Sequence, residues 1–442
     1  MGIKDFIITP IYLGLFTILA IVIRPYVTTS RTRKYFLPAL WVRFIGAIAL
    51  GVIYQFYYGG GDTLNYWEHG SKWIWQALNE QPVVGIKMLL EGGSKWNPET
   101  FSYTNNIWYY KSPSSYAIVK ITTVFDLFTL HTYSATALFF SVFSFSGLWA
   151  LFTSLQKKYP RSNKLVLGIL FFPSLIFWGS GILKDTITIG ALGWMLWALI
   201  EWIEFRSRNY FGLVIFIIAF MAVSVIKLYV VLCLIPTIII WLFLKYLRVV
   251  KSLVLRILII PFLIIVCGVG AYLILQQITE GNRQYELTNL AERAKITAYD
   301  IRYGWGARLE GDGGYDLGEL DGTWSNMVQL APKAVVVSLF RPFPWEVRNP
   351  LMLLASLESI VILILVIRLF TRPMGITKIM KDPFLIFCLA FTILFSFAIG
   401  ISSYNFGTLM RYKIPMIPLL LTFLLVNTSA TNSNEKSILH QS

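Results

Sequence analysis

The sequence predicts an all-α protein, a polytopic bundle of membrane-spanning helices. Two observations lead to this fold class. Hydrophobic residues make up 56% of the 442 residues and charged residues only 14%, whereas a soluble domain has roughly 25% charged residues. Apolar segments close to the roughly 20 residues needed to cross a bilayer also recur along the chain. A chain with so few charges is expected to turn apolar side chains toward lipid.

The predicted spans number about 11, or about 12–13 if further apolar segments cross. The first span ends at Arg24 without the small-residue cleavage site of a signal peptide, so we interpret it as a retained membrane helix. No internal repeat is evident, which argues against a transporter built from inverted repeats. The predicted spans are 6–23, 36–58, 133–153, 165–182, 186–203, 211–227, 228–246, 255–276, 352–371, 383–402 and 413–427.

Lysine and arginine set the orientation of the spans, because they collect in cytoplasmic loops. One set of connecting segments is rich in these residues, around Arg24, Lys157, Arg206, Lys245 and Lys378. The long segments 59–131 and 277–350 mix acids and bases almost evenly, so we place them outside the cytoplasm. The chain is then a single transmembrane domain over residues 1–427, with two large outer loops and a polar tail over 428–442 that we expect to be disordered.

The remaining composition excludes some classes of site. The net charge of +15 is explained by the cytoplasmic loops, and no basic stripe lies in a soluble segment, so no nucleic acid partner is expected. The three cysteines lie inside apolar runs and have no zinc-type spacing, so we expect neither disulfides nor a zinc site.

Residues 115–130 break the alternation of sides. They are apolar enough for a short span, yet a crossing there would place the basic loop around Lys157 outside. Lys120 and Asp126 also lie within the run, and charges in lipid are costly. We therefore interpret the segment as re-entrant or interfacial. The alternative is a true span with an undetected partner elsewhere.

The first outer loop begins with YYGGGDTLNYWEHG at 57–70, directly after a predicted span. Leu64, Trp67 and Ile74 fall on one face of an amphipathic helix expected to lie on the membrane. Asp62 is the first acid after the span, and a carboxylate held at the surface suits a general base acting on a sugar hydroxyl. The alternative is that Asp62 only caps the helix.

The segment GGGDTLNYW resembles the first outer loop of membrane glycosyltransferases of the GT-C superfamily. There an acidic residue follows the first or second span and precedes a juxtamembrane helix, often with a tyrosine a few residues on. The resemblance implies that Asp62 is the catalytic residue and that polyprenyl-phosphate sugars are the donors. Tyr66 and Glu68 become candidates for substrate binding. Many members have two adjacent acids, whereas Thr63 follows Asp62 here, so a mechanism without metal is easier to envisage while a divalent metal cofactor stays open.

Lys184 and Asp185 lie at the outer end of a predicted helical hairpin, in SGILKD at 180–185. A lysine there can bind a lipid-linked phosphate as a point charge. The alternative is an ordinary ion pair at a turn. The phrase SGILKD also resembles segments of bacterial cell-surface polysaccharide proteins, among them glycosyltransferases and O-antigen polymerases.

The second outer loop ends in SLFRPFPWEVRNP at 338–350. Arg341 is expected to pair with Glu346 or to grip phosphate. Glu358 lies inside the next predicted span, where an acid needs a partner, and Arg341 is its candidate. The glycine-rich, acidic part of this loop, near Asp321, is expected to bind the acceptor or to form a lid. A calcium site there lacks the spacing of an EF-hand loop, and a solvated loop without a role is the alternative.

Arg411 and Tyr412 lie at the outer mouth of the last predicted span, followed by spaced prolines. This arrangement resembles the end of several polyprenyl-phosphate-sugar-dependent transferases, which implies a place near the donor phosphate. A guanidinium suits phosphate because its planar fork binds two oxygens at once. The alternative is an interfacial anchor.

These features together predict a membrane glycosyltransferase acting on the outer face of a bacterial inner membrane. Its partners would be a polyprenyl-phosphate sugar or lipid-linked glycan and the surrounding lipid. The alternative is an O-antigen-type polysaccharide polymerase, which predicts essential arginines in the outer loops and a dispensable Asp62. A lipid-linked glycan flippase or transporter is a third class, and it requires polar groups at mid-membrane such as Arg43 and Glu358.

Overall fold

The computed structural model describes residues 2–207, 210–247, 290–303, 313–371 and 381–426. Over these residues the chain is α-helical, and its only β-type pairing is an isolated bridge between Gly314 and Asn405. The predicted all-α fold is confirmed. The predicted span 255–276 and the tail 428–442 lie outside the described residues.

Eight helices in the described part of the chain are long and apolar enough to cross a membrane, so this is a multi-pass membrane protein. A shorter apolar helix, α12, covers Tyr210–Ile226. The eight are α1 (Ile3–Val27), α2 (Arg33–Val52) with its π-helical extension η1 (Ile53–Tyr57), α8 (Tyr133–Lys158), α11 (Lys184–Ile203), α13 (Leu228–Leu247), α18 (Pro350–Phe370), α20 (Pro383–Ser403) and the helix Phe406–Val426, which begins with α21 (Phe406–Tyr412) and η4 (Ile414–Met416).

The chain forms two compact units. Unit 1 holds Met1–Lys158 and Leu170–Lys227. Its core is the pair α8 and α11, against which α1, α2 and α12 pack. α1 is the most open of these helices, and its exposed isoleucines and leucines suit contact with lipid.

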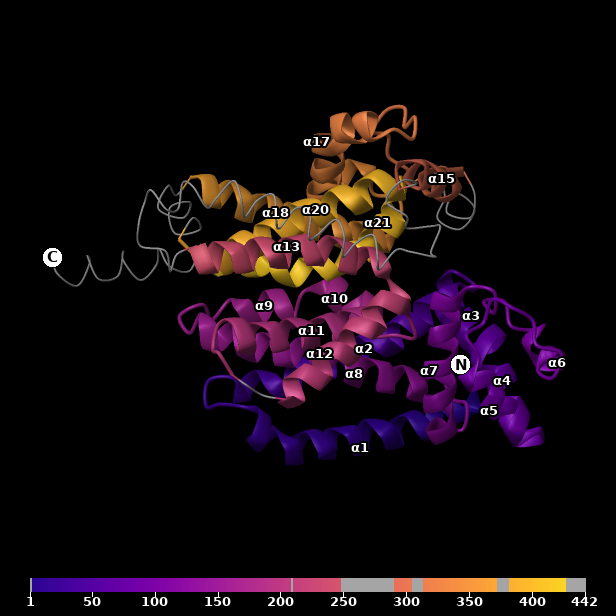
Figure 1. Cartoon of the computed structure of the whole chain (residues 1–442). Helices are drawn as coiled ribbons and strands as arrows, with labels where there is room; N and C mark the ends of the chain where they lie inside the picture. The colour runs from indigo at the N-terminus through magenta and orange to yellow at the C-terminus, as the bar shows by residue number, and fades with distance from the viewer. Residues whose placement is uncertain (1, 208–209, 248–289, 304–312, 372–380, 427–442) are drawn as a thin grey trace. The chain divides into compact units, whose positions relative to one another are not determined.

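The segment predicted to be the first outer loop is folded into short helices within unit 1. Figure 1 shows α3 to α7 gathered at the end of unit 1 where α1 begins. The same end is marked by Ser134, at the start of α8, whose backbone N–H donates to Asp5 near the start of α1 at 2.8 Å. The loop helices are α3 (Asp62–Tyr66), π-helical η2 (Trp67–Ser71), α4 (Lys72–Glu80), α5 (Pro82–Leu90), α6 (Phe101–Thr104) and α7 (Pro113–Thr129).

The segment predicted to be re-entrant or interfacial is helix α7, and it is not among the eight long apolar helices. Both halves of α7 are bonded to the outer loop. The Tyr116 hydroxyl donates to the Met88 carbonyl at 2.7 Å, and the Ser71 hydroxyl donates to Asp126 at 2.6 Å. These contacts hold α7 beside the loop helices along its length.

Unit 2 holds Tyr159–Ile169 and the described residues from Leu228 onward. Helix α20 is its centre and packs against α13, against α17 (Trp324–Phe340) and against α15 (Leu290–Tyr303). The helix Phe406–Val426 is the most buried of the apolar helices, and Gly168 of α9 (Leu165–Ile169) packs against its Leu421 side chain.

The predicted span 165–182 was wrong as a single helix. The structure has α9, then α10 (Pro173–Trp178), and α11 begins only at Lys184. Proline at position 173 cannot donate a backbone hydrogen bond to a preceding turn, so a new helix starts there. The buried Arg43 guanidinium binds the carbonyls of Leu175 and Gly179 at 2.7 and 3.0 Å, which satisfies the end of α10 inside the bundle.

The contact between α8 and α11 depends on glycine. A Cβ atom built at Gly147 would overlap the backbone carbonyl of Gly190. We predict that Gly147→Ala lowers the free energy of unfolding by about 1–3 kcal/mol, because overpacking outweighs the better helix propensity of alanine. Thermal unfolding in detergent measures the effect. Gly14→Ala is the control, since nothing lies within 4 Å of that position in α1; equal loss of stability in both variants would contradict the prediction.

Candidate functional site

Asp62 follows a glycine turn that ends the second membrane helix. Gly59, Gly60 and Gly61 have φ angles of +67°, +153° and +127°, which L-residues with side chains rarely adopt. A Cβ at Gly61 would also strike the Tyr54 ring. Because Gly61 is the N-cap, Asp62 is the first residue of α3 and not its cap. The alternative interpretation from the sequence, that Asp62 only caps the helix, is therefore wrong.

The Asp62 carboxylate is half-buried and accepts a hydrogen bond of 2.8 Å from the Tyr109 hydroxyl. Tyr66 is buried, and its ring packs against the Tyr109 ring with the two centroids 5.0 Å apart. Glu68 is exposed on η2. π-helical turns such as η1 and η2, on either side of Asp62 in the chain, are frequent at functional sites.

Lys184 reaches the same segment of the loop that holds Asp62. It is the first residue of α11, is partly exposed, and donates from Nζ to the Ser114 hydroxyl at 2.9 Å. The short segment 109–114 thus binds Asp62 through Tyr109 and Lys184 through Ser114. Two of the predicted site residues are brought to one stretch of chain that the sequence analysis did not single out.

Asp185, the next residue, is bonded to a different part of unit 1. Its carboxylate is buried and forms an ion pair with the equally buried ammonium group of Lys227, just beyond α12. A buried pair of this kind joins α11 to the end of α12 and so supports Lys184. The sequence analysis included Lys227 in the predicted span 211–227 and did not identify it as a paired residue. A lone lysine in an apolar run needs a partner, and this was the available signal.

In unit 2, Arg341 forms an ion pair with Glu346, as expected from the sequence. Burial raises the pKa of Glu346, but hydrogen bonds from the Arg341 side chain and the Phe343 backbone outweigh it and hold the pKa below its usual range. The Arg341 guanidinium also lies 5.0 Å from the Phe406 ring, at the start of α21. Arg411 lies on the same helix, α21. Two arginines predicted to bind phosphate are thus associated with α21: Arg411 belongs to it, and Arg341 contacts its first residue.

The remaining predicted groups of unit 2 lie near the last span. Arg411 and Tyr412 are half-buried, and the Tyr412 ring lies 6.3 Å from that of Tyr229. The predicted pairing of Glu358 with Arg341 is not the one observed, because Arg341 is bonded to Glu346 and the buried Lys413 interacts electrostatically with Glu358. The predicted proximity of Asp62 to Arg341 or Arg411 stays a prediction.

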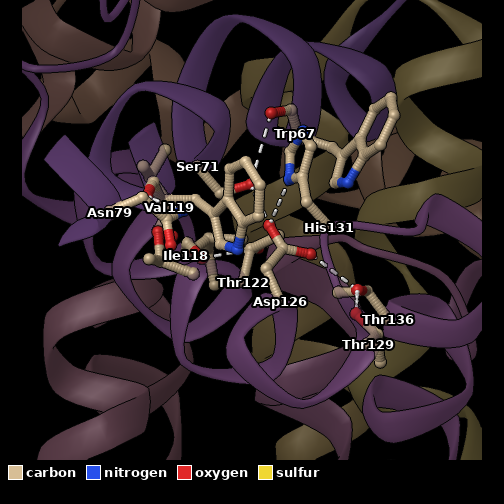
Figure 2. A network of polar contacts seen from close by, with 12 residues as sticks. Trp67, Ser71, Asn79, Ile118, Val119, Thr122, Asp126, Thr129, His131 and Thr136 are labelled. Carbon is tan, nitrogen blue, oxygen red and sulfur yellow. Dashed lines mark hydrogen bonds and ion pairs between the residues drawn. The ribbon is translucent and has the colours of Figure 1, made fainter. Parts of the chain in front are cut away.

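A network missed by the sequence analysis surrounds Asp126 in α7 (Figure 2). Asp126 is fully buried and accepts hydrogen bonds from the hydroxyls of Ser71 and Thr136, each at 2.6 Å. The Nδ1 atom of His131 lies 2.9 Å from the same carboxylate. The only sequence signal for this network was the charge of Asp126 inside an apolar run.

The described part of the second outer loop forms a pocket of about 410 Å³ between α15 and the residues before α17. Glu292, Tyr299 and Asp321 line it. Asp321 accepts from the Thr323 backbone and Asp316 from that of Gly318, so these acids stabilise their own turns. Among the residues described, no three His, Cys, Asp or Glu side chains are grouped to hold a metal ion.

Comparisons with known proteins add no relative. A scan against protein-family models found no match to this chain, and neither did searches of curated proteins and of solved structures.

The pair Asp185–Lys227 gives a test of its structural role. We predict that Lys227→Met lowers the free energy of unfolding by about 3–5 kcal/mol, because it leaves a buried carboxylate without its cation. The double variant with Asp185→Leu is expected to recover most of that stability. Lys157→Met, which removes a half-exposed partner of Glu201, should cost about 1 kcal/mol or less. Thermal unfolding of the three variants measures these changes in stability. A double variant no more stable than Lys227→Met would contradict the structural role of the Asp185–Lys227 pair.

Proposed function

We propose that the protein is a membrane glycosyltransferase, resembling the GT-C superfamily, which transfers a sugar from a polyprenyl-phosphate-linked donor to a cell-envelope acceptor. The reaction would take place on the extracytoplasmic face of a bacterial inner membrane. One observation carries the proposal most strongly. A half-buried carboxylate, Asp62, and a lysine ammonium, Lys184, are held by one outer-loop segment through Tyr109 and Ser114.

Asp62 would act as the general base. Its carboxylate takes the proton from the acceptor hydroxyl while that oxygen forms a bond to the anomeric carbon of the donor sugar. The bond between the anomeric carbon and the lipid phosphate breaks, and the electron pair leaves with the phosphate oxygen. The hydrogen bond from Tyr109 helps to fix the direction of the carboxylate.

Cations are needed where charge develops on the leaving phosphate. Lys184 is a partly exposed ammonium at the start of α11, and it donates to the Ser114 hydroxyl at 2.9 Å, so a cation lies at the same loop segment as Asp62. Unit 2, taken by itself, carries Arg341 and Arg411, whose planar guanidinium groups are of the kind that binds phosphate oxygens. Arg341 is oriented for this by Glu346 on one side and the Phe406 ring on another.

The central test is Asp62→Asn. We expect the rate of sugar transfer from a polyprenyl-phosphate sugar to fall by about 10²- to 10⁴-fold, which is the usual contribution of a general base. Tyr109→Phe should lower the rate by a smaller factor, because the base remains and only its orientation suffers. The assay uses radiolabelled donor in vesicles, with and without added divalent metal ion, since metal dependence is a separate variable.

Glu99→Gln is the matched control. Glu99 lies in the same outer loop and is an exposed partner of Lys87, so its loss is expected to leave transfer unchanged. Full activity of Asp62→Asn would exclude Asp62 as the base. If Arg411→Lys then abolished joining of lipid-pyrophosphate-linked glycans, the polysaccharide polymerase would replace the transferase as the better explanation.

A further inference from the structure

The imidazole of His131 forms a polar contact through its edge and stacks on aromatic rings through its faces. Its Nδ1 atom meets the buried carboxylate of Asp126 at 2.9 Å. The Trp67 ring stacks on it with centroids 4.4 Å apart and planes 12° apart, and the Trp75 ring is 5.4 Å away at 22°. His131 and the preceding Leu130 both have a φ angle of +53°, an uncommon conformation that turns the chain so that the imidazole enters this place.

These contacts converge on one side of the helical segment that carries Asp62. Thr63, Trp67 and Ser71 recur at every fourth position of that segment. The Thr63 hydroxyl lies 2.6 Å from the Tyr133 hydroxyl, Trp67 stacks on His131, and Ser71 donates to Asp126. All three partners belong to α7, to the start of α8 or to the turn between them, so the whole face is held by one corner of unit 1.

A neighbouring face of the same segment carries the residues of the proposed site. Asp62 accepts from Tyr109, and Tyr66, one helical turn later, packs against the Tyr109 ring. The position of the Asp62 carboxylate is therefore set by two sets of contacts on neighbouring faces of the segment. A shift of the segment toward or away from the α7–α8 corner would displace the carboxylate from Tyr109.

We infer that Asp126 and His131 are positioning residues for Asp62, acting as a clamp on the segment 62–71. The inference rests on the proposed function for its catalytic consequence, although the clamp itself is a matter of structure. A displacement of about 1 Å in a catalytic group can lower a rate by about 100-fold, so a clamp this close to the base is expected to affect turnover more than donor binding.

The clamp is separable from the general stability of α7. The other half of that helix is fixed independently, by the bond from Tyr116 to Met88 and by the bond of 2.9 Å from Lys120 to the Glu91 carbonyl. Loss of the clamp is therefore expected to loosen 62–71 while α5 and the first half of α7 stay protected.

The test compares Asp126→Asn, His131→Phe and His131→Gln in the full-length protein. Phenylalanine keeps a flat ring between the two indoles but has no Nδ1 donor, whereas glutamine keeps an N–H donor for Asp126. Tyr116→Phe is the control, because it removes a hydrogen bond from the other half of α7. Amide hydrogen exchange is followed in peptides covering 62–71 and 82–90, and kcat and KM for the lipid donor are measured alongside.

We expect Asp126→Asn and His131→Phe to speed exchange in 62–71 by about tenfold, since each weakens a charge-assisted hydrogen bond. Exchange in 82–90 should not change. In the same variants kcat should fall at least tenfold while KM for the donor changes less than about twofold. His131→Gln is expected to restore most of the protection and turnover, and Tyr116→Phe to leave exchange in 62–71 unchanged.

Unchanged exchange in 62–71 would overturn the clamp. A loss of turnover with unchanged exchange would also overturn it, because His131 would then act on substrate directly. Full activity of Asp62→Asn together with faster exchange in the clamp variants would separate the two ideas. The proposed function would fail, whereas the clamp on segment 62–71 would remain as a structural feature that does not serve catalysis by Asp62.

Discussion

The structure depends on one constraint: lipid offers no hydrogen bonds, so polar groups inside the bundle must find partners within the chain. Arg43 shows the constraint at work. Nη1 of its buried guanidinium donates to the Ser144 hydroxyl and to two carbonyls around the end of α10, while Nε and Nη2 have no hydrogen-bond partner among the described residues. A helix interrupted between membrane spans would otherwise expose unsatisfied carbonyls, each costly in such surroundings. The broken segment 165–182 is tolerated because an arginine from another helix reaches it.

The same constraint explains which parts of the fold the sequence predicts. A continuous span satisfies its own backbone, so local hydropathy is enough to locate α1, α8 or α20. Pro173 is a local signal for the start of α10, but the carbonyls at the end of α10 are bound by Arg43, which lies more than a hundred positions away in the chain, and no local pattern reveals that partner. Lys227 was missed for a related reason. Its apolar neighbours dominate the hydropathy of the segment, while its partner Asp185 comes from another helix.

The residues of the candidate site likewise fall into those that the sequence predicted and those that it did not. Asp62 and Lys184 were found from residue type, from their place at span ends and from the inferred side of the membrane. Tyr109 and His131 were not found, because a tyrosine or histidine in a loop gains meaning only from what it contacts. Asp62 and Tyr109 are separated by 47 positions and Ser71 and Asp126 by 55. Arg341 and Glu346, only five positions apart, were paired correctly.

The buried charge of Asp126 and the position of Asp62 are connected in unit 1. A carboxylate such as Asp126 is tolerated inside the protein because Ser71, Thr136 and His131 all bond to it. Those donors come from η2, from α8 and from the turn before α8, so satisfying one charge also fixes three segments relative to one another. The helix that carries Asp62 continues directly into η2. The demand for hydrogen-bond partners thus places the half-exposed carboxylate with a rigidity that a loop resting on the membrane surface would not have by itself.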